Sequence, residues 1–152
     1  MATLWVRHAP SSAAVARRSV AAAFRKAGFS QDEAFDIALI ASELVGNAVR
    51  HGLPLPSGHI AIEWTFTEDS YRITVTDGGD AAPRISPREA EPEDTCGRGL
   101  MIVAALTADW GVERTSAGTS VWASGPLPQA APLSQEAHHA RDGDGSALQS
   151  VG

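Results

Sequence analysis

One segment of the chain combines residue types that can act on a phosphate ester. Glu43, Asn47 and Arg50 are spaced four and three residues apart, so on a helix they lie on one face. A glutamate can accept a proton from an attacking hydroxyl group. The side-chain oxygen of an asparagine is a hard ligand of the kind that Mg²⁺ takes. Asp36 extends this polar stripe. A solvated helix face is the alternative, and this element alone favours it.

A second candidate element is Asp77-Gly78-Gly79, which follows an alternating apolar segment. Asp-Gly and Gly-Gly pairs are typical of turns. A buried aspartate can also accept a hydrogen bond from the exocyclic amine of a purine. A glycine two residues later lets a flat ring approach the backbone. The segment alone favours the turn.

Two later elements bring in glycine and threonine. Gly97-Arg98-Gly99-Leu100 precedes an apolar helix, and free amides at a helix N-terminus bind anions such as phosphates. Many helices begin this way, so the structural and functional interpretations are equal here. Gly118-Thr119 opens the last predicted strand, and Thr119 gains meaning only if that strand lies beside the one ending at Asp77.

Capping residues and apolar spacing predict the first elements. Residues 4–6 indicate a short strand. Ser11 or Ser12 can cap a helix that Gly28 ends. The capping box at residues 30–33 opens a second helix that runs to about residue 50 and is stopped by Gly52. Alternation over residues 60–66 and 71–75 predicts two antiparallel strands joined by a turn at 67–70.

The second half of the chain predicts a loop, a helix and a hairpin. Residues 80–97 carry three prolines and many charges, which favours a functional loop. A helix is expected over residues 98–106, followed by strands at 110–114 and 119–123. The composition after Ser124 favours a disordered tail. We therefore expect one domain at residues 1–124 and a tail at 125–152.

Composition limits the class of protein. The 152 residues and a net charge of −6 fit one acidic domain, and this charge argues against nucleic acid as the main partner. Neither a signal peptide nor an apolar run of roughly 18 residues is present, so no membrane partner is expected. The single cysteine, Cys96, excludes an internal disulfide. We expect a cytoplasmic location.

The order of the four elements resembles the GHKL (Bergerat) ATP-binding fold of gyrase, heat-shock-ninety chaperones, sensor histidine kinases and anti-sigma factor kinases. The segment 43–52 looks like its N box, Asp77-Gly78-Gly79 like the first glycine box and Gly97-Arg98-Gly99 like the second. The resemblance covers about residues 4–124. It implies an α/β two-layer sandwich, with a mixed, mainly antiparallel sheet and helices on one face.

The lone domain and the wording Glu43-Leu-Val-Gly-Asn-Ala-Val-Arg-His-Gly52 are especially close to bacterial anti-sigma regulatory kinases. This resemblance implies an ATP- and Mg²⁺-dependent serine/threonine protein kinase that phosphorylates an anti-anti-sigma (STAS-type) partner. It would also sequester a sigma factor, and relatives suggest a homodimer. The rival is a non-catalytic protein-binding regulator of GHKL fold with weak or no ATP binding. A third alternative is a metabolic enzyme of another fold that matches by accident.

The resemblance implies roles for matching positions. Glu43 would be the catalytic base, Asn47 would hold Mg²⁺, and Asp77 would bind the adenine amine. Residues 80–97 would form a lid. The remaining ATP-binding positions are Gly79 beneath the ring, Thr119 supporting Asp77, Gly97 and Gly99 with amides toward the phosphates, Arg98 toward the terminal phosphate, and Arg50, His51 and Leu100 within the boxes. Ala81 departs from the family pattern, which often has glycine there.

Overall fold

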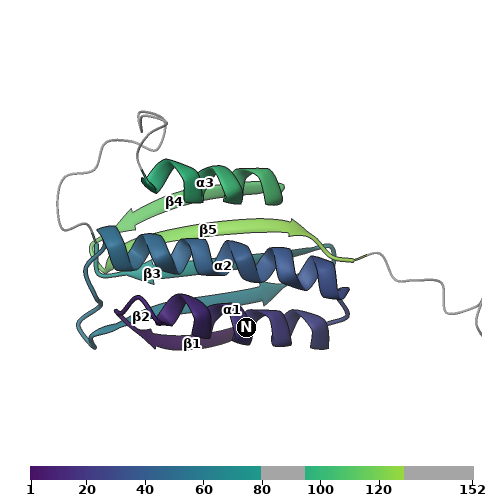
Figure 1. Ribbon diagram of the computed structural model, residues 1–152, viewed down its shortest axis with the longest axis horizontal. Coiled ribbons are helices and arrows are strands. Elements are labelled where there is room, and N and C mark those ends of the chain that lie inside the picture. The colour runs from purple at the N-terminus through teal and green to yellow at the C-terminus, as the bar shows by residue number, and fades with distance from the viewer. Residues whose placement is uncertain (80–94, 129–152) are drawn as a thin grey trace, which may run out of the picture.

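The computed structural model describes residues 1–79 and 95–128, with side chains described for 1–79 and 99–128. Five strands and three helices make up this part of the chain (Figure 1). They are β1 (Ala2–Arg7), α1 (Ser12–Lys26), α2 (Gln31–His51), β2 (His59–Phe66), β3 (Ser70–Asp77), α3 (Thr95–Leu106), β4 (Asp109–Thr115) and β5 (Gly118–Pro126).

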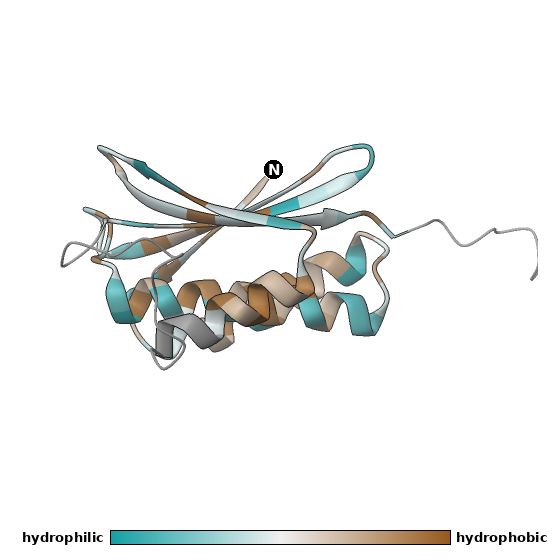
Figure 2. Ribbon diagram, turned by 90° about the horizontal axis from the view of Figure 1, so that it is seen from above, coloured by the Kyte–Doolittle hydropathy of each residue, from teal (hydrophilic) through white to brown (hydrophobic). Residues whose placement is uncertain are grey.

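The strands form one sheet in the order β1-β2-β3-β5-β4, and the helices lie together on one of its faces (Figure 2). This confirms the predicted two-layer α/β sandwich. Every neighbouring pair of described strands is antiparallel, where a mixed sheet was expected. The reason is the position of β5. Strands β3 and β4 run in the same direction, but β5 lies between them and pairs antiparallel with both.

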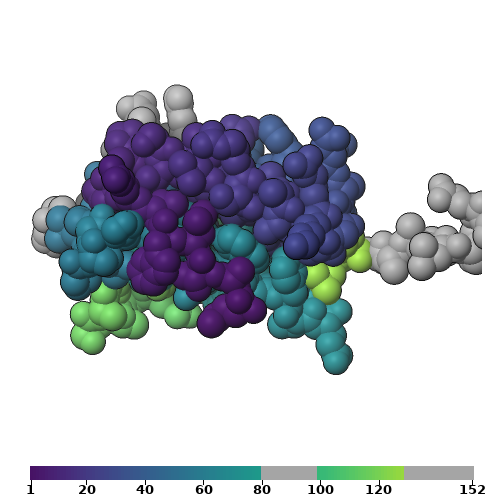
Figure 3. All heavy atoms as spheres, turned by 90° about the horizontal axis from the view of Figure 1, so that it is seen from below, coloured from purple at the N-terminus to yellow at the C-terminus, as the bar shows by residue number. Residues whose placement is uncertain are grey.

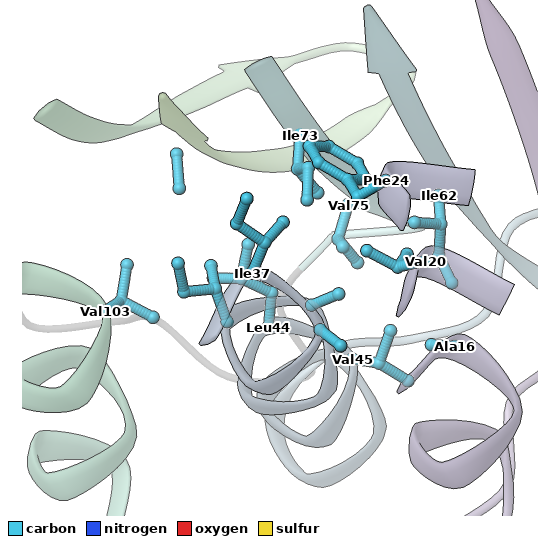
Figure 4. Packing of buried hydrophobic residues seen from close by; sticks show 14 of the residues in the cluster. Ala16, Val20, Phe24, Ile37, Leu44, Val45, Ile62, Ile73, Val75 and Val103 are labelled. Atoms are coloured by element: carbon cyan, nitrogen blue, oxygen red, sulfur yellow. The ribbon is translucent and has the colours of Figure 1, made fainter. Parts of the chain in front are cut away.

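Helix α2 runs along the middle of the helical layer and is fixed at both ends by its sequence. Ser30 and Glu33 form the predicted capping box, in which the Ser30 hydroxyl accepts from the Glu33 amide and the Glu33 carboxylate accepts from the Ser30 amide. Gly52 is the C-cap residue. Along its length, Ile37, Leu44 and Val45 point into the core beside side chains of α1 and the sheet (Figure 4). The apolar stripe thus anchors the helix that carries Glu43 and Asn47.

Helix α1 begins differently from the prediction. Ser11 is the N-cap residue, but its backbone is helical (φ −64°, ψ −17°) and its side chain does not cap the helix within the described residues. Ser12 donates its hydroxyl to the carbonyl oxygen of Arg7 instead. The serine therefore ties the start of α1 to the end of β1, because the turn between them is only a few residues long. Figure 3 shows β1 and α1 together on one side of the molecule.

An aromatic cluster closes the core at the end of α2 opposite to Gly52. Phe24, Phe29 and Tyr71 have ring centroids 5.0–5.8 Å apart, and Phe66 packs against both phenylalanines. Burial, together with the charge of Asp36, raises the pKa of Tyr71 to about 12. The carboxylate of Asp36 therefore acts at this end of α2.

Several boundaries differ from those expected. Helix α3 begins at Thr95, three residues before the predicted start. Strand β5 continues to Pro126, and the amide of Leu127 donates to the carbonyl of Asp69 at 3.0 Å. Pairing and packing of the described residues thus continue beyond residue 124. Most of the predicted loop at 80–97 and of the tail lies outside the described residues.

Among residues 1–79 and 95–128, the helices are all too short or too polar to cross a membrane.

Candidate functional site

Asp77 and Thr119 meet at one end of the sheet. Asp77 is the last residue of β3 and Thr119 is the second residue of β5, and the two are direct partners in the antiparallel pairing. Asp77 is 5% exposed and Thr119 is 3% exposed. The condition under which Thr119 gains meaning is therefore met, because its strand lies beside the one that ends at Asp77. A buried carboxylate at a strand end is costly unless polar groups meet it, so the surroundings of Asp77 define the site.

Main-chain groups enclose the Asp77 carboxylate. The amide of Gly79 donates to Oδ1 at 2.8 Å, and Gly79 has φ 104°, a conformation that favours glycine. Gly52 lies so close to Oδ2 that a side chain there would overlap that oxygen. Gly118 lies equally close to the Asp77 carbonyl. Gly79 and Gly52 thus lie against the carboxylate, and Gly118 lies against the backbone of the same residue.

The turn after α2 is joined to the strand end that carries Asp77. The Leu53 amide donates to the Gly79 carbonyl at 2.8 Å, and the Gly78 amide donates to the Leu53 carbonyl at 2.7 Å. A carbon atom added to Gly78 would overlap the carbonyl of Pro54. Helix α2 and the Asp77 loop are therefore one connected backbone unit, because hydrogen bonds run in both directions between them.

Glu43 and Asn47 form the other end of the site, on α2 beneath α3. Asn47 is 7% exposed, so the alternative of a solvated helix face does not describe it, whereas Glu43 is half-buried and keeps part of its surface in solvent. Gly99 of α3 is buried against them. A carbon atom added to Gly99 would stand 2.8 Å from Oε2 of Glu43 and 3.4 Å from Oδ1 of Asn47. The second glycine segment and the N-box-like segment are therefore in contact.

Arg50 is the third member of the polar stripe on α2. Its Nη2 donates to Oδ1 of Asn47 at 3.2 Å. An open pocket of about 440 Å³ lies on the other side of Glu43, between α1 and α2, and Arg17 and Arg50 contribute to its lining. Glu43 therefore borders both Gly99 and an accessible hollow, while the guanidinium of Arg50 meets the amide oxygen that was expected to bind a metal.

Helix α3 places the two glycines of the second segment differently from the expectation. Because the helix begins at Thr95, Gly97 belongs to its first turn, where amides lack partners within the helix. Gly99 stands one residue beyond that turn, so its amide is expected to serve the helix, and its contribution is the close approach to Glu43. Leu100 is half-buried in the same helix, and the side chain of Arg98 is outside the described residues.

Two further predicted positions take different places. His51 is the last residue of α2 and is half-buried, next to the turn that meets Asp77. Asp36 does not join the site, although it shares the stripe on α2. It lies near the start of the helix, is exposed, and acts on Tyr71.

The sequence did not indicate the two residues that connect the turn to Asp77. Gly52 was expected to end α2 and to close the N-box-like segment, but its position against the Asp77 carboxylate was not expected. His8 follows β1, and its Nε2 lies 2.8 Å from the Gly52 carbonyl and 3.2 Å from the Ala48 carbonyl. Both contacts join segments some forty residues apart, so no local spacing signals them.

Comparison with known proteins identifies the family. A model of the histidine kinase-like ATPase domain matches residues 6–124. A comparison with proteins of curated function found no match.

Three solved structures with the same fold, from two bacteria, illustrate the similarity. The structure of the RsbU and RsbW domains of a Mycobacterium tuberculosis protein has a TM-score of 0.59 at 20% identity, over 84% of this chain and 33% of that one. A blue-light-activated histidine kinase from Erythrobacter litoralis gives a TM-score of 0.53 at 22% identity, over 74% of this chain and 41% of that one.

The histidine kinase domain of a blue-light-activated histidine kinase from the same organism has a TM-score of 0.50 at 23% identity, over 73% of this chain and 59% of that one. This chain therefore spans between about a third and three fifths of these proteins. With residues 6–124 matched to the family and the sheet, helices and glycine segments in the corresponding order, the chain belongs to the histidine kinase-like ATPase (GHKL) domain family.

Proposed function

We propose that this protein is an ATP-dependent serine/threonine protein kinase that regulates an anti-sigma circuit. The observation that supports it most is the contact of Gly99 with Glu43 and Asn47. This contact lies at one end of the candidate site, and the buried Asp77 lies at the other. The base Glu43, the metal ligand Asn47 and the N-terminus of α3 would then lie near the phosphates of ATP. Asp77 would accept a hydrogen bond from the adenine amine. The sequence of residues 43–52, which resembles that of anti-sigma regulatory kinases, supports the proposed role in an anti-sigma circuit.

The side chains present fit Mg²⁺ and ATP. Asn47 offers a buried carboxamide oxygen, which is a hard ligand, and Mg²⁺ commonly combines one or two protein oxygens with substrate phosphates. Asp77 offers a buried acceptor that Gly79 orients. Bound ATP supplies the phosphoryl group. Asn47 would hold the metal, the amide of Gly97 would meet phosphate oxygens, and Thr119 would support Asp77.

Glu43 would act on the acceptor protein. In the proposed reaction, a serine or threonine oxygen forms a bond to the γ-phosphorus, the bond from that phosphorus to ADP breaks, and Glu43 takes the hydroxyl proton. The half-buried position of Glu43 beside an open pocket supports this role, because the acceptor hydroxyl must arrive from outside. The acceptor that we propose is an anti-anti-sigma protein of the STAS type, and the second partner is a sigma factor.

One observation favours the rival function, a non-catalytic regulator. The hydrogen bond from Arg50 occupies Oδ1 of Asn47, so metal binding requires that Arg50 turn away or share this oxygen. Ala81 departs from the family pattern as well. If Arg50 keeps the amide oxygen, the protein would act through contact alone.

The decisive experiment uses the full chain with labelled ATP, Mg²⁺ and candidate anti-anti-sigma proteins. We expect label on a serine or threonine of one candidate, and its loss with Glu43→Gln. Binding of ATP with Mg²⁺, measured by calorimetry, separates the two functions. ATP binding without transfer to any partner would favour the non-catalytic regulator, and absence of ATP binding at millimolar concentration would overturn the kinase proposal.

A further inference from the structure

His8 connects the start of the chain to the turn behind Asp77. It follows β1 directly, and its Nε2 lies 2.8 Å from the Gly52 carbonyl and 3.2 Å from the Ala48 carbonyl. Carbonyl oxygens only accept hydrogen bonds, so Nε2 carries the proton and donates to both. These carbonyls belong to the last turn of α2, where the negative end of the helix dipole favours a donor.

The Gly52–Leu53 segment connects His8 to Oδ2 of Asp77 directly and to Oδ1 through Gly79. The Gly52 residue, whose carbonyl His8 binds, lies against Oδ2. The next residue, Leu53, exchanges hydrogen bonds with Gly78 and Gly79, and the Gly79 amide donates to Oδ1. Movement of the Gly52 peptide would therefore shift two of the groups that lie against the carboxylate.

We propose that His8 is a positioning residue that sets the Asp77 carboxylate for a 6-amino purine. This inference rests on the proposed ATP site. His8 does not touch the nucleotide. It holds the Gly52 peptide, and that peptide determines where the carboxylate points. Its consequence is selectivity: the protein prefers a base that donates a hydrogen bond at position 6 over one with a carbonyl there.

A purely structural role predicts a different outcome. If His8 only joined β1 to α2, its loss would lower the stability of the fold and would weaken the binding of every nucleotide by the same factor. If it positions Asp77, its loss lowers the preference for ATP over inosine triphosphate, which carries oxygen at position 6. The ratio of the two dissociation constants therefore separates the roles.

Two amide substitutions provide a matched pair. In His8→Gln the amide nitrogen reaches the place of Nε2 and can donate to Gly52. In His8→Asn the amide nitrogen corresponds to Nδ1 and falls short of that carbonyl. Val20→Ala is the control for stability, because Val20 is fully buried in α1 and a cavity there lowers stability without contacting Gly52.

The experiment measures the affinity of the full chain and its variants for ATP and inosine triphosphate by calorimetry with Mg²⁺. We expect His8→Asn to lower the ATP preference by roughly five- to tenfold, since a hydrogen bond to a charged group is weakened but not removed. His8→Gln should keep the preference within about twofold of the parent, and Val20→Ala should leave it unchanged. An unchanged preference in His8→Asn would overturn the inference, as would a loss that His8→Gln shares.

A second measurement does not depend on the fold of a variant. In ¹⁵N spectra of the parent protein, saturating ATP should shift the Nε2 resonance of His8. A resonance that ATP leaves in place contradicts the inference. A parent protein that binds neither nucleotide overturns the proposed ATP site, and the inference falls with it. A parent that binds ATP while His8→Asn keeps its selectivity overturns the inference alone.

Discussion

At the Asp77 end of the candidate site main-chain groups hold the functional side chain, whereas at the Glu43 end side chains hold one another. Asp77 is enclosed by an amide and by the close approach of glycine backbones. Asn47 instead accepts a hydrogen bond from the exposed Arg50, and Glu43 lies against Gly99 beside an open pocket.

The difference teaches which part of the site can reorganise. A backbone enclosure has few alternative positions, because its hydrogen bonds belong to the fold itself. Side chains such as Arg50 and Glu43 change rotamer at small cost when a ligand offers better partners. We therefore expect the Asp77 end to control affinity and the Glu43 end to control turnover.

The largest effect is expected at the Glu43 end. Glu43→Gln should lower kcat for transfer to the acceptor protein by about 10²–10⁴-fold, because the general base is lost, and should leave ATP affinity unchanged. Ser42→Ala is the matched control. Ser42 lines the same pocket, and its hydroxyl donates to the Leu39 carbonyl at 2.8 Å. Steady-state kinetics with calorimetry checks this, and an equal loss in ATP affinity would break the comparison.

The next effect is expected at the Asp77 end. Asp77→Ala should weaken ATP binding by roughly 1–3 kcal/mol, since the adenine amine loses its acceptor, and kcat at saturating ATP should change little. Asp77→Asn keeps one acceptor oxygen and should be milder. Asp69→Ala, in the exposed turn before β3, serves as the control. Unchanged ATP affinity in Asp77→Ala, measured by calorimetry, would remove Asp77 from the site.

Two glycine substitutions compare the ends directly. Gly52→Ala would overlap Asp77 and bring its methyl group 2.8 Å from the Ala48 carbonyl, so we expect a loss of about 1–3 kcal/mol in unfolding free energy. In Gly99→Ala the added methyl group contacts the flexible end of the Glu43 side chain. Replacing a glycine inside a helix stabilises the helix by about 0.5–1 kcal/mol, which offsets the cost of this contact. The stability of Gly99→Ala should be near that of the parent, while kcat falls about tenfold through misplacement of Glu43.

Urea unfolding and kinetics on both glycine variants test this pair. If Gly99→Ala were the less stable of the two, the phosphate end would be as rigid as the Asp77 end, and the distinction between them would disappear.

The smallest effect concerns the sheet end remote from both. Leu127 packs against the core, and its amide donates to Asp69. Removing residues 126–152 should lower the free energy of unfolding by about 1–2 kcal/mol more than removing residues 129–152. The shorter deletion should leave the free energy of unfolding nearly unchanged, as the composition of that segment suggests. Neither deletion should alter ATP affinity or kcat. Thermal unfolding and calorimetry check this, and reduced affinity in either deletion would show that stability and the site are coupled.

Local patterns allowed most of the fold to be predicted. The capping box at Ser30, the stripe on α2 and the alternation of β2 and β3 each depend on residues within one element. The parallel pair implied by a mixed sheet was absent among the described strands because the place of β5 depends on the whole topology. The site followed the same rule. Glu43 and Asn47 share one helix, but the contacts of His8 and Gly52 cross from one element to another.

Burial was the second quantity that spacing alone could not provide. Asn47 lies on the polar stripe with Arg50, yet it is buried and Arg50 is exposed. The difference arises from the approach of Gly99 in α3, a helix that is more than forty residues later in the chain. The spacing of residues along a helix predicts which side chains share a face. Which of these side chains are buried depends on the packing of a helix that lies far away in the sequence.

The position of β5 inside the sheet also affects synthesis. It is the last of the strands that the structure describes, but it separates β3 from β4. A nascent chain that ends before residue 118 therefore exposes the hydrogen-bonding edge of β3, and β4 has no neighbour to join. Such edges invite pairing with other chains. We expect the polypeptide to depend on chaperones until β5 leaves the ribosome, and premature termination products to aggregate.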